Sequence, residues 1–238
     1  MGGRFQCVDC QDLSMEPTQY STQAVTLPPH DGEGLLGLPL APACGIVLFA
    51  HGSGSSRLSP RNIFVAEALQ TAGIATLLFD LLTEQEATNR GKVFDISLLA
   101  NRLSQAANWL STSAVTGNLP LGFFGASTGA AAALVAAAGR KDVRAIVSRG
   151  GRPDLAGDAL ETVTAPTLLI VGGLDPEVLA LNRAACRRLR CERKLEMVPG
   201  ATHLFEEPGT LESVVALARA WFLRHLASDV VEPAPAPA

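Results

Sequence analysis

The feature that most constrains the fold is an alternation of short apolar runs with helical segments. The runs at 45–50 (GIVLFA), 74–79 (IATLLF) and 167–171 (TLLIV) are apolar along their whole length, as strands buried on both faces of a sheet are. Helical patterns separate them, and in 95–110 the apolar residues recur at helical spacing. This alternation indicates an α/β fold with a mostly parallel central sheet and helices on both faces.

We expect about eight strands, at 23–40 (two strands around a turn at 28–34), 45–50, 74–79, 119–124, 143–148, 167–171 and 194–198. Helices are predicted at 59–71, 95–110, 128–138, 176–189 and 210–226. The Ser59 hydroxyl and Pro60 together are typical of a helix start, with a capping side chain and a proline in the first turn. Only residues 149–166 separate two of the strands, which leaves no room for a large cap domain there.

Length and composition predict one soluble domain. The 238 residues suit a single α/β domain, which we place at 23–227, after a flexible leader (1–22) and before a disordered Pro/Ala-rich tail (228–238). A net charge of −4 without a basic block argues against nucleic acid as a partner. The leader lacks the apolar core of a secretory signal, and no run is long enough to span a bilayer. We expect a monomer or a homodimer.

The cysteines indicate a reducing compartment. Their number is five, and an odd count fits the cytoplasm better than a disulfide framework. Cys7 and Cys10 form a single C-x-x-C pair, but no second pair or suitably spaced histidine follows, so we interpret the pair as incidental and expect no metal site.

A candidate nucleophile lies in the pentapeptide 125–129 (GASTG), which matches G-x-S-x-G. The motif directly follows the predicted strand 119–124 and directly precedes the predicted helix 128–138, which is the context that a nucleophile elbow requires. So sharp a reversal from strand to helix tolerates only small residues. It would expose the Ser127 hydroxyl at a helix N-terminus, where the helix dipole favours negative charge.

A serine nucleophile needs a base, and histidine occurs at four positions. His30 precedes the main sheet, and His225 lies on the last helix four residues after a tryptophan. Only His51 and His203 follow strands and can reach the edge where Ser127 would lie. Because the elbow motif is accompanied by the chain order serine, acid, histidine, we predict His203 as the base.

The acid should follow an intervening strand, and Asp175 directly follows 167–171. It would hold the His203 ring in one tautomer and stabilise the imidazolium. The alternative is that Asp175 only caps the helix that starts at Pro176, and one side chain could do both. Asp80 is the rival acid, but it precedes Ser127 in the chain and is interpreted as a structural or pocket residue.

The segments LFAHGSGSS, GASTG, VGGLDP and PGATHLF resemble, in this order, the dienelactone hydrolase-like branch of the α/β-hydrolase superfamily. HGSGSSRLSPRN, LLFDLLTEQE and SRGGRPD are similar to a bacterial subgroup, some of whose members are fused to a phosphoribosyltransferase-like domain. The resemblance implies the α/β-hydrolase fold and an oxyanion hole formed by the Thr128 and Ser53 backbone N–H groups. It also implies that His51 shapes the loop that contains Ser53 by hydrogen bonding and does not act as the base. Dienelactone hydrolases proper use cysteine, and serine here favours ordinary ester chemistry.

Four arginines lie in or just after loops at the carboxyl edge of the sheet, where crevices form in open α/β folds: Arg57, Arg61, Arg149 and Arg152. Their guanidinium groups could bind a carboxylate or phosphate of the substrate. The favoured alternative is salt bridges with neighbours such as Asp80, Glu84, Glu86 or Asp154.

The sequence therefore predicts a serine hydrolase that cleaves carboxylic esters of small or flexible substrates through an acyl-enzyme, with no cofactor. The same residues could serve a lactone, thioester or amide hydrolase or an acyltransferase. A non-catalytic module that binds a ligand through a hydrolase fold is the alternative from another class.

Overall fold

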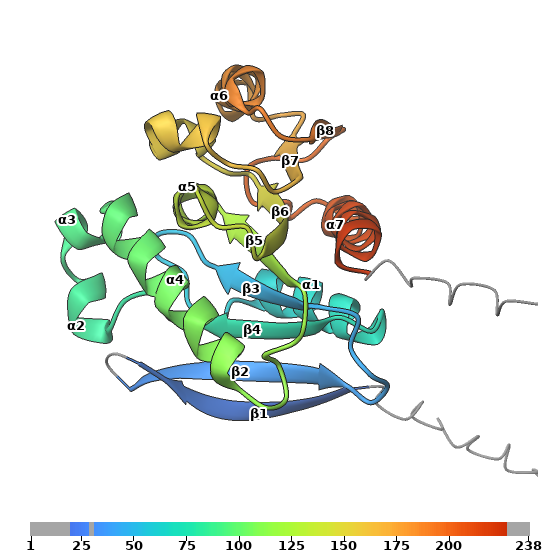
Figure 1. Ribbon diagram of the computed structural model, residues 1–238. Coiled ribbons are helices and arrows are strands. Elements are labelled where there is room, and N and C mark those ends of the chain that lie inside the picture. Colours follow the sequence, from blue (N-terminus) through green and yellow to red (C-terminus); the bar gives the residue numbers. More distant parts are fainter. Residues whose placement is uncertain (1–19, 29–30, 228–238) are drawn as a thin grey trace, which may run out of the picture.

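The computed structural model describes residues 20–28 and 31–227. Eight strands form one sheet in the order β1-β2-β4-β3-β5-β6-β7-β8 (Figure 1). The hairpin β1–β2 is antiparallel, β2 is antiparallel to β4, and the other neighbouring strands are parallel. The mostly parallel sheet of the prediction is confirmed. The strands are β1 (Tyr20–Leu27), β2 (Gly32–Pro39), β3 (Ile46–Ala50), β4 (Ala75–Phe79), β5 (Leu121–Ala126), β6 (Val143–Arg149), β7 (Thr167–Gly172) and β8 (Arg193–Val198).

Helices cover both faces of the sheet (Figure 1). One face packs against α4, α5, α6 and the 3₁₀ helix η1, and the other packs against α1 and α7. The helices are α1 (Pro60–Thr71), α2 (Glu84–Ala87), α3 (Arg90–Val93), α4 (Ile96–Thr112), α5 (Thr128–Ala137), η1 (Pro153–Glu161), α6 (Pro176–Arg188) and α7 (Thr210–Leu226).

The continuous apolar runs are strands buried on both sides. In β3, Ile46 and Leu48 belong to the core on the α4–α5 face, whereas Val47 and Phe49 belong to the core on the α1–α7 face. Successive side chains of a strand point to opposite faces, so a strand between two helical layers has to be apolar at every position. This explains why these runs lack the alternation of apolar and polar residues that a half-exposed strand shows.

Three short helices, α2, α3 and η1, were not predicted. The first two are stabilised by local caps rather than by apolar periodicity: Thr83 and Glu86 form a reciprocal capping box on α2, and the Asn89 side chain caps α3. The predicted Ser59 cap is wrong. Ser59 occupies the cap position, but its hydroxyl accepts no bond from the helix, which starts instead with Pro60 and the Ile63 N–H bond to the Ser59 carbonyl.

The strand β1 begins at Tyr20, so the last three residues of the predicted leader 1–22 belong to the sheet. The rest of the leader with Cys7 and Cys10, the residue His30 and the predicted tail 228–238 lie outside the described residues. Within the described ranges, only loops and η1 connect β6 to β7, so no large cap covers the sheet edge there. None of the described helices is long and apolar enough to cross a membrane.

Candidate active site

Ser127 lies at a sharp reversal between β5 and α5, with φ 50° and ψ −121°. This backbone conformation is strained for a residue with a side chain and is typical of functional sites. Small residues make the turn possible: a Cβ at Gly125 would lie 2.4 Å from the Cα of Ala130, and one at Gly129 would lie 2.0 Å from the carbonyl oxygen of Ala50. The geometry is that of the predicted elbow.

His203 and Asp175 meet in the loops that follow β8 and β7. The His203 Nδ1 atom donates to Asp175 Oδ2 at 2.8 Å. Because a carboxylate only accepts, the proton lies on Nδ1, which leaves Nε2 of the neutral ring as an acceptor. Asp175 Oδ1 also accepts the Val178 N–H at 3.3 Å, so this side chain both orients the histidine and caps α6.

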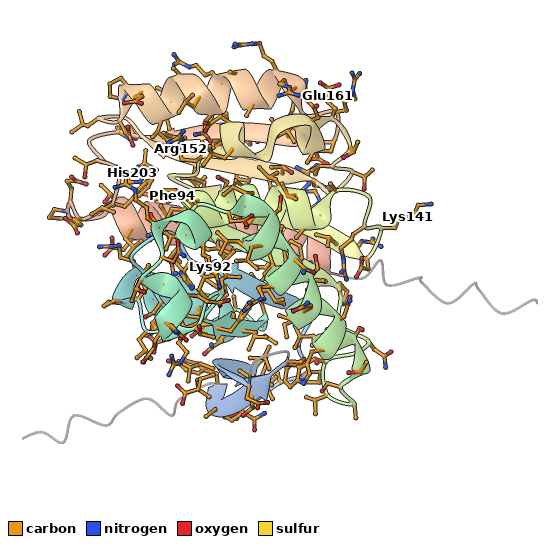
Figure 2. All side chains as sticks on the ribbon, turned by 90° about the vertical axis from the view of Figure 1, so that its left-hand side faces the viewer. Lys92, Phe94, Lys141, Arg152, Glu161 and His203 are labelled. Carbon is orange, nitrogen blue, oxygen red and sulfur yellow. The ribbon has the colours of Figure 1, made fainter. Side chains whose placement is uncertain are left out.

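These loops lie at the carboxyl edge of the parallel strands. His203 and Arg152 follow β8 and β6, and they lie on the same side of the molecule in Figure 2. Lys141, which precedes β6, lies on the opposite side. Open α/β folds place their ligand crevices at this edge.

The segment 149–152 contacts both the serine and the histidine. The Ser127 N–H donates to the Arg149 carbonyl at 3.3 Å, and the Arg152 N–H donates to the Ser127 carbonyl at 3.0 Å. Gly150 has φ +51°, and a Cβ there would lie 3.0 Å from the His203 carbonyl oxygen and 3.6 Å from its ring Cε1. The His203 loop thus packs directly on the segment that holds the Ser127 backbone.

The loop after β3 approaches the nucleophile from the other side. A Cβ at Gly52 would lie 2.9 Å from the Cβ of Ser127, so only glycine allows this approach. The Ser53 N–H donates to the Thr128 hydroxyl at 3.1 Å. Thr128 is the first residue of α5, and its N–H has no intrahelical acceptor. The two predicted oxyanion donors thus belong to residues that are neighbours in space. An oxyanion would have to replace the Thr128 hydroxyl as the acceptor of the Ser53 N–H.

His51 holds this loop in place rather than contacting the serine. Its Nε2 atom accepts the Leu81 N–H at 3.1 Å, so Nδ1 carries the proton and donates to the Gly52 carbonyl at 3.0 Å. Burial lowers the pKa of the His51 ring, while the Gly52 carbonyl and Asp80 oppose this effect. A neutral His51 fits the loop-shaping role predicted for it.

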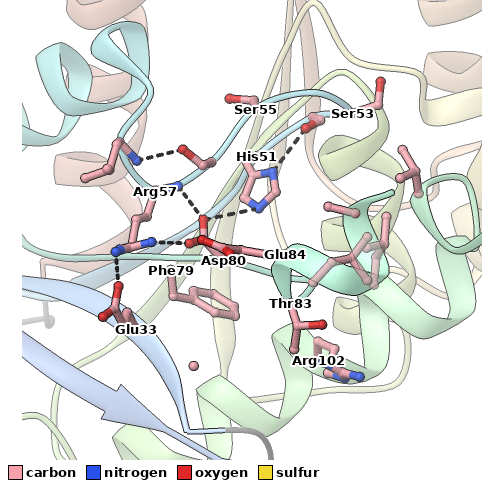
Figure 3. A pocket seen from close by; sticks show the side chains of 18 of the residues that line it. Glu33, His51, Ser53, Ser55, Arg57, Phe79, Asp80, Thr83, Glu84 and Arg102 are labelled. Carbon is pink, nitrogen blue, oxygen red and sulfur yellow. Dashed lines mark hydrogen bonds and ion pairs between the residues drawn. The ribbon is translucent and has the colours of Figure 1, made fainter. Parts of the chain in front are cut away.

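Arg57 and Asp80 form the second half of this support (Figure 3). Asp80 Oδ1 accepts the Arg57 N–H at 2.7 Å, and Asp80 Oδ2 pairs with the guanidinium. The same guanidinium pairs with Glu33 of β2. Asp80 thus binds this loop through Arg57 and also lines the cavity beside it, and the salt-bridge interpretation applies to Arg57.

Two further arginines are also paired. Arg152 binds both carboxylate oxygens of Asp154, at 2.9 and 2.8 Å, and Arg61 binds Glu206 at 3.0 Å. The sequence named Asp80 and Asp154 correctly among the partners. Glu86, by contrast, binds Lys92 and Arg102.

Arg149 differs from the other three. Its side chain is only 8% exposed, and its single polar partner within the described ranges is Asn62 Oδ1, at 3.5 Å. Burial and the nearby Arg61 charge lower its pKa to about 10. Of the four arginines, this one lacks the predicted carboxylate partner in the part of the chain that is described.

A cavity of about 650 Å³ lies on the side of His51, Ser53 and Asp80 (Figure 3). Neither Ser127 nor His203 lines it, although Thr128 does. No group of three or more His, Cys, Asp or Glu side chains within 20–28 and 31–227 is arranged to hold a metal ion.

Comparison with known proteins gives close relatives. No family model matches the sequence. A solved dienelactone hydrolase from Anabaena variabilis is 53% identical with a TM-score of 0.83, over 87% of this chain and 99% of that one. The esterase Est1E of Butyrivibrio proteoclasticus is 17% identical with a TM-score of 0.72, over 86% and 99% of the two chains. This second likeness shows the fold alone.

Two Mycobacterium tuberculosis proteins, provisionally named phosphoribosyl transferases, are 63% identical over 194 residues. The match covers 81% of this chain and 44% of theirs, so the chain spans less than half the length of these curated relatives. The Anabaena structure, by contrast, is matched along almost its whole length. From its identity with that structure, the chain belongs to the dienelactone hydrolase-like family of the α/β-hydrolases.

Proposed function

We propose that the protein is a serine esterase in which Ser127 is the nucleophile, His203 the base and Asp175 the acid. The observation that carries the proposal is the 2.8 Å bond from His203 Nδ1 to Asp175, in a loop packed on the segment that holds Ser127. This bond leaves His203 Nε2 free to accept a proton. The strained backbone of Ser127 supports the same assignment, because such strain persists where function requires it.

The reaction runs through an acyl-enzyme. Ser127 Oγ attacks the ester carbonyl carbon while His203 Nε2 takes the hydroxyl proton. The carbon–oxygen bond to the alcohol breaks, and His203 returns the proton to the leaving oxygen. A water molecule then attacks the acyl-enzyme with His203 as base, and the carboxylic acid and free Ser127 are released.

The oxyanion of each tetrahedral intermediate is held by the backbone N–H groups of Thr128 and Ser53. Each donor contributes on the order of 3 kcal/mol to the transition state. The Ser53 N–H is bonded to the Thr128 hydroxyl in the free protein. A small displacement of this hydroxyl makes the second donor available to the oxyanion.

The open carboxyl edge favours esters of small or flexible molecules over lipids, which need a deep tunnel. A lactone, thioester or amide hydrolase, or an acyltransferase, would use the same three residues. The mechanism requires no cofactor.

We place the protein in the cytoplasm on the odd number of cysteines and expect a monomer or homodimer that acts on small molecules. Arg149 stays a candidate for contact with an anionic group of the substrate.

The proposal is tested with p-nitrophenyl esters of increasing acyl length, beside a lactone and a thioester, for the native protein and Ser127→Ala. We expect ester hydrolysis that Ser127→Ala abolishes without change in the unfolding midpoint. If the folded native protein hydrolyses none of these compounds, the non-catalytic binding module is favoured instead.

A further inference from the structure

The cavity beside the oxyanion loop lies on one side of the nucleophile. Its lining comes from the β1–β2 hairpin, the loops after β3 and β4, the helices α2 to α4, and Thr128. No lining residue comes from β6, β7 or β8 or from the loops that follow them. In the sheet order, β5 with its Ser127 separates these two groups of strands.

In the proposed reaction, the alcohol and the acyl chain of the tetrahedral carbon lie on different sides of Ser127. His203 must protonate the leaving oxygen, so the alcohol lies on the side of the loop after β8. The carbonyl oxygen faces the N–H groups of Ser53 and Thr128. The remaining substituent of the tetrahedral carbon is the acyl chain, which is directed toward β3 and β4, where the cavity lies.

The cavity offers a large apolar surface. Its volume of about 650 Å³ lies within the ordinary range for pockets that bind organic molecules. The apolar wall is formed by side chains from β1, β4, the loop after β4, α3 and α4. Three of them belong to the buried core. The five residues are Leu27, Phe79, Leu82, Val93 and Leu99. A bulky acyl group would bury its carbon atoms against this wall, at about 25 cal/mol for each Å² removed from water.

The charged residues of the lining do not favour an anion. The two lining guanidinium groups are already paired, Arg57 with Asp80 and Glu33, and Arg102 with Glu86. Two further lining carboxylates have no basic partner within 20–28 and 31–227: Asp31 and Glu84. A carboxylate on the acyl chain would therefore lie near other carboxylates. Among the described residues of the lining, it would find no guanidinium group that is not already paired.

We propose that this cavity is the acyl subsite and that it selects neutral, bulky apolar acyl groups over acyl groups that carry a carboxylate. The inference rests on the proposed esterase function and adds its substrate class.

The first test compares matched esters of the native protein. p-Nitrophenyl 4-methylpentanoate and p-nitrophenyl hemisuccinate have acyl groups of nearly the same shape, and only the second carries a carboxylate. We expect kcat/KM to be at least ten-fold higher for the neutral ester, because the cavity lacks a free cation. Equal values, or a preference for the hemisuccinate, would overturn the charge part of the proposal.

The second test fills the cavity. Val93→Trp adds a large side chain at a half-buried lining residue of α3. We expect kcat/KM for p-nitrophenyl cyclohexanecarboxylate to fall at least ten-fold, while p-nitrophenyl acetate changes less than three-fold. Phe94→Trp is the matched control, since Phe94 is the next residue, is 47% exposed and does not line the cavity. If Val93→Trp does not fold, Ala87→Leu at the exposed end of α2 narrows the same cavity.

Acetates of phenol and 2-naphthol separate the acyl group from the alcohol. We expect Val93→Trp to leave kcat/KM for both acetates unchanged. A loss that follows the size of the alcohol instead would overturn the assignment of the acyl chain to this cavity. If none of the p-nitrophenyl esters is hydrolysed, the proposed function fails. If acetate is hydrolysed but acyl size has no effect, only the acyl subsite fails.

Discussion

The two loops that flank Ser127 are held in different ways. On the β8 side, His203 is positioned by one bond to Asp175 and by packing on Gly150. On the β3 side, the loop with Ser53 is held by His51 and by the ion pairs of Arg57. The first arrangement places a reactive side chain, and the second places a backbone N–H. Replacing the reactive side chain on the β8 side should therefore remove activity without loss of stability, whereas changes on the β3 side should affect both.

The largest effect is expected for His203→Ala. Without a base, kcat for ester hydrolysis should fall on the order of 10⁶-fold, while the urea unfolding midpoint stays unchanged, because the His203 side chain is 38% exposed. His225→Gln is the control, since that histidine packs on Trp221 away from the site. Full activity in His203→Ala would exclude His203 as the base.

Asp175→Asn separates the two contacts of this side chain. Asparagine still caps α6, because it is as good an N-cap as aspartate, but it cannot hold His203 in the same tautomer. We expect kcat to fall on the order of 10⁴-fold with the unfolding free energy unchanged within about 0.5 kcal/mol. Asp175→Ala should also lose the cap, about 1 kcal/mol of stability. Activity retained in both variants would mean that Asp175 is only a cap.

Gly52→Ala tests the close approach of the β3 loop to the nucleophile. Its Cβ would lie 2.9 Å from Ser127 Cβ and 3.1 Å from the Ala126 carbonyl oxygen, so the loop has to shift. Displacement of one oxyanion donor should lower kcat on the order of 10²-fold. The control is Gly32→Ala, where the nearest atom lies 3.9 Å away. Because Gly32 lines the proposed acyl cavity, both variants are compared with p-nitrophenyl acetate, whose acyl group is too small to fill it. Equal kinetics for the two variants would mean that the loop does not contribute a donor.

Asp80→Asn tests the charged support of the same loop. The amide oxygen can still accept the Arg57 N–H, but the ion pair is lost. Because both side chains are about one fifth exposed, we expect a loss of about 1–2 kcal/mol in unfolding free energy and less than a ten-fold fall in kcat/KM. A fall as large as that of Asp175→Asn would identify Asp80 as the acid instead.

The smallest effect is a pH dependence of stability. Burial lowers the pKa of His51 in the folded protein below the ordinary 6.5 that it has in the unfolded chain. Between the folded and the unfolded pKa, the unfolded chain therefore binds more protons than the folded one. The unfolding free energy should thus fall as the pH drops below about 6.5. The pKa of His225 is lowered in the same way. Urea titrations at pH 7.5, 6.5 and 5.5 should show a weaker dependence in His51→Gln, and an unchanged slope would contradict the burial of a neutral His51.

Local patterns were enough to predict most of the fold and the three proposed catalytic residues. Strand, elbow and helix are contiguous around Ser127, and only two of the four histidines follow strands. The short helices α2 and α3 were missed because their caps leave no apolar period. The contacts from Ser53 to Thr128 and from Arg57 to Glu33 join residues 75 and 24 positions apart. Nothing in a local pattern specifies such pairs, because the packing of separate strands creates them.

The central claim is that Ser127 is a nucleophile activated by His203, and covalent labelling tests it most directly. A fluorophosphonate probe reacts with activated serines, and mass spectrometry of the digested protein locates the adduct. We predict stoichiometric labelling of the native protein on the peptide that contains Ser127, none in Ser127→Ala, and strongly slowed labelling in His203→Ala. A folded native protein that takes up no probe, or an adduct at another residue, would contradict the claim.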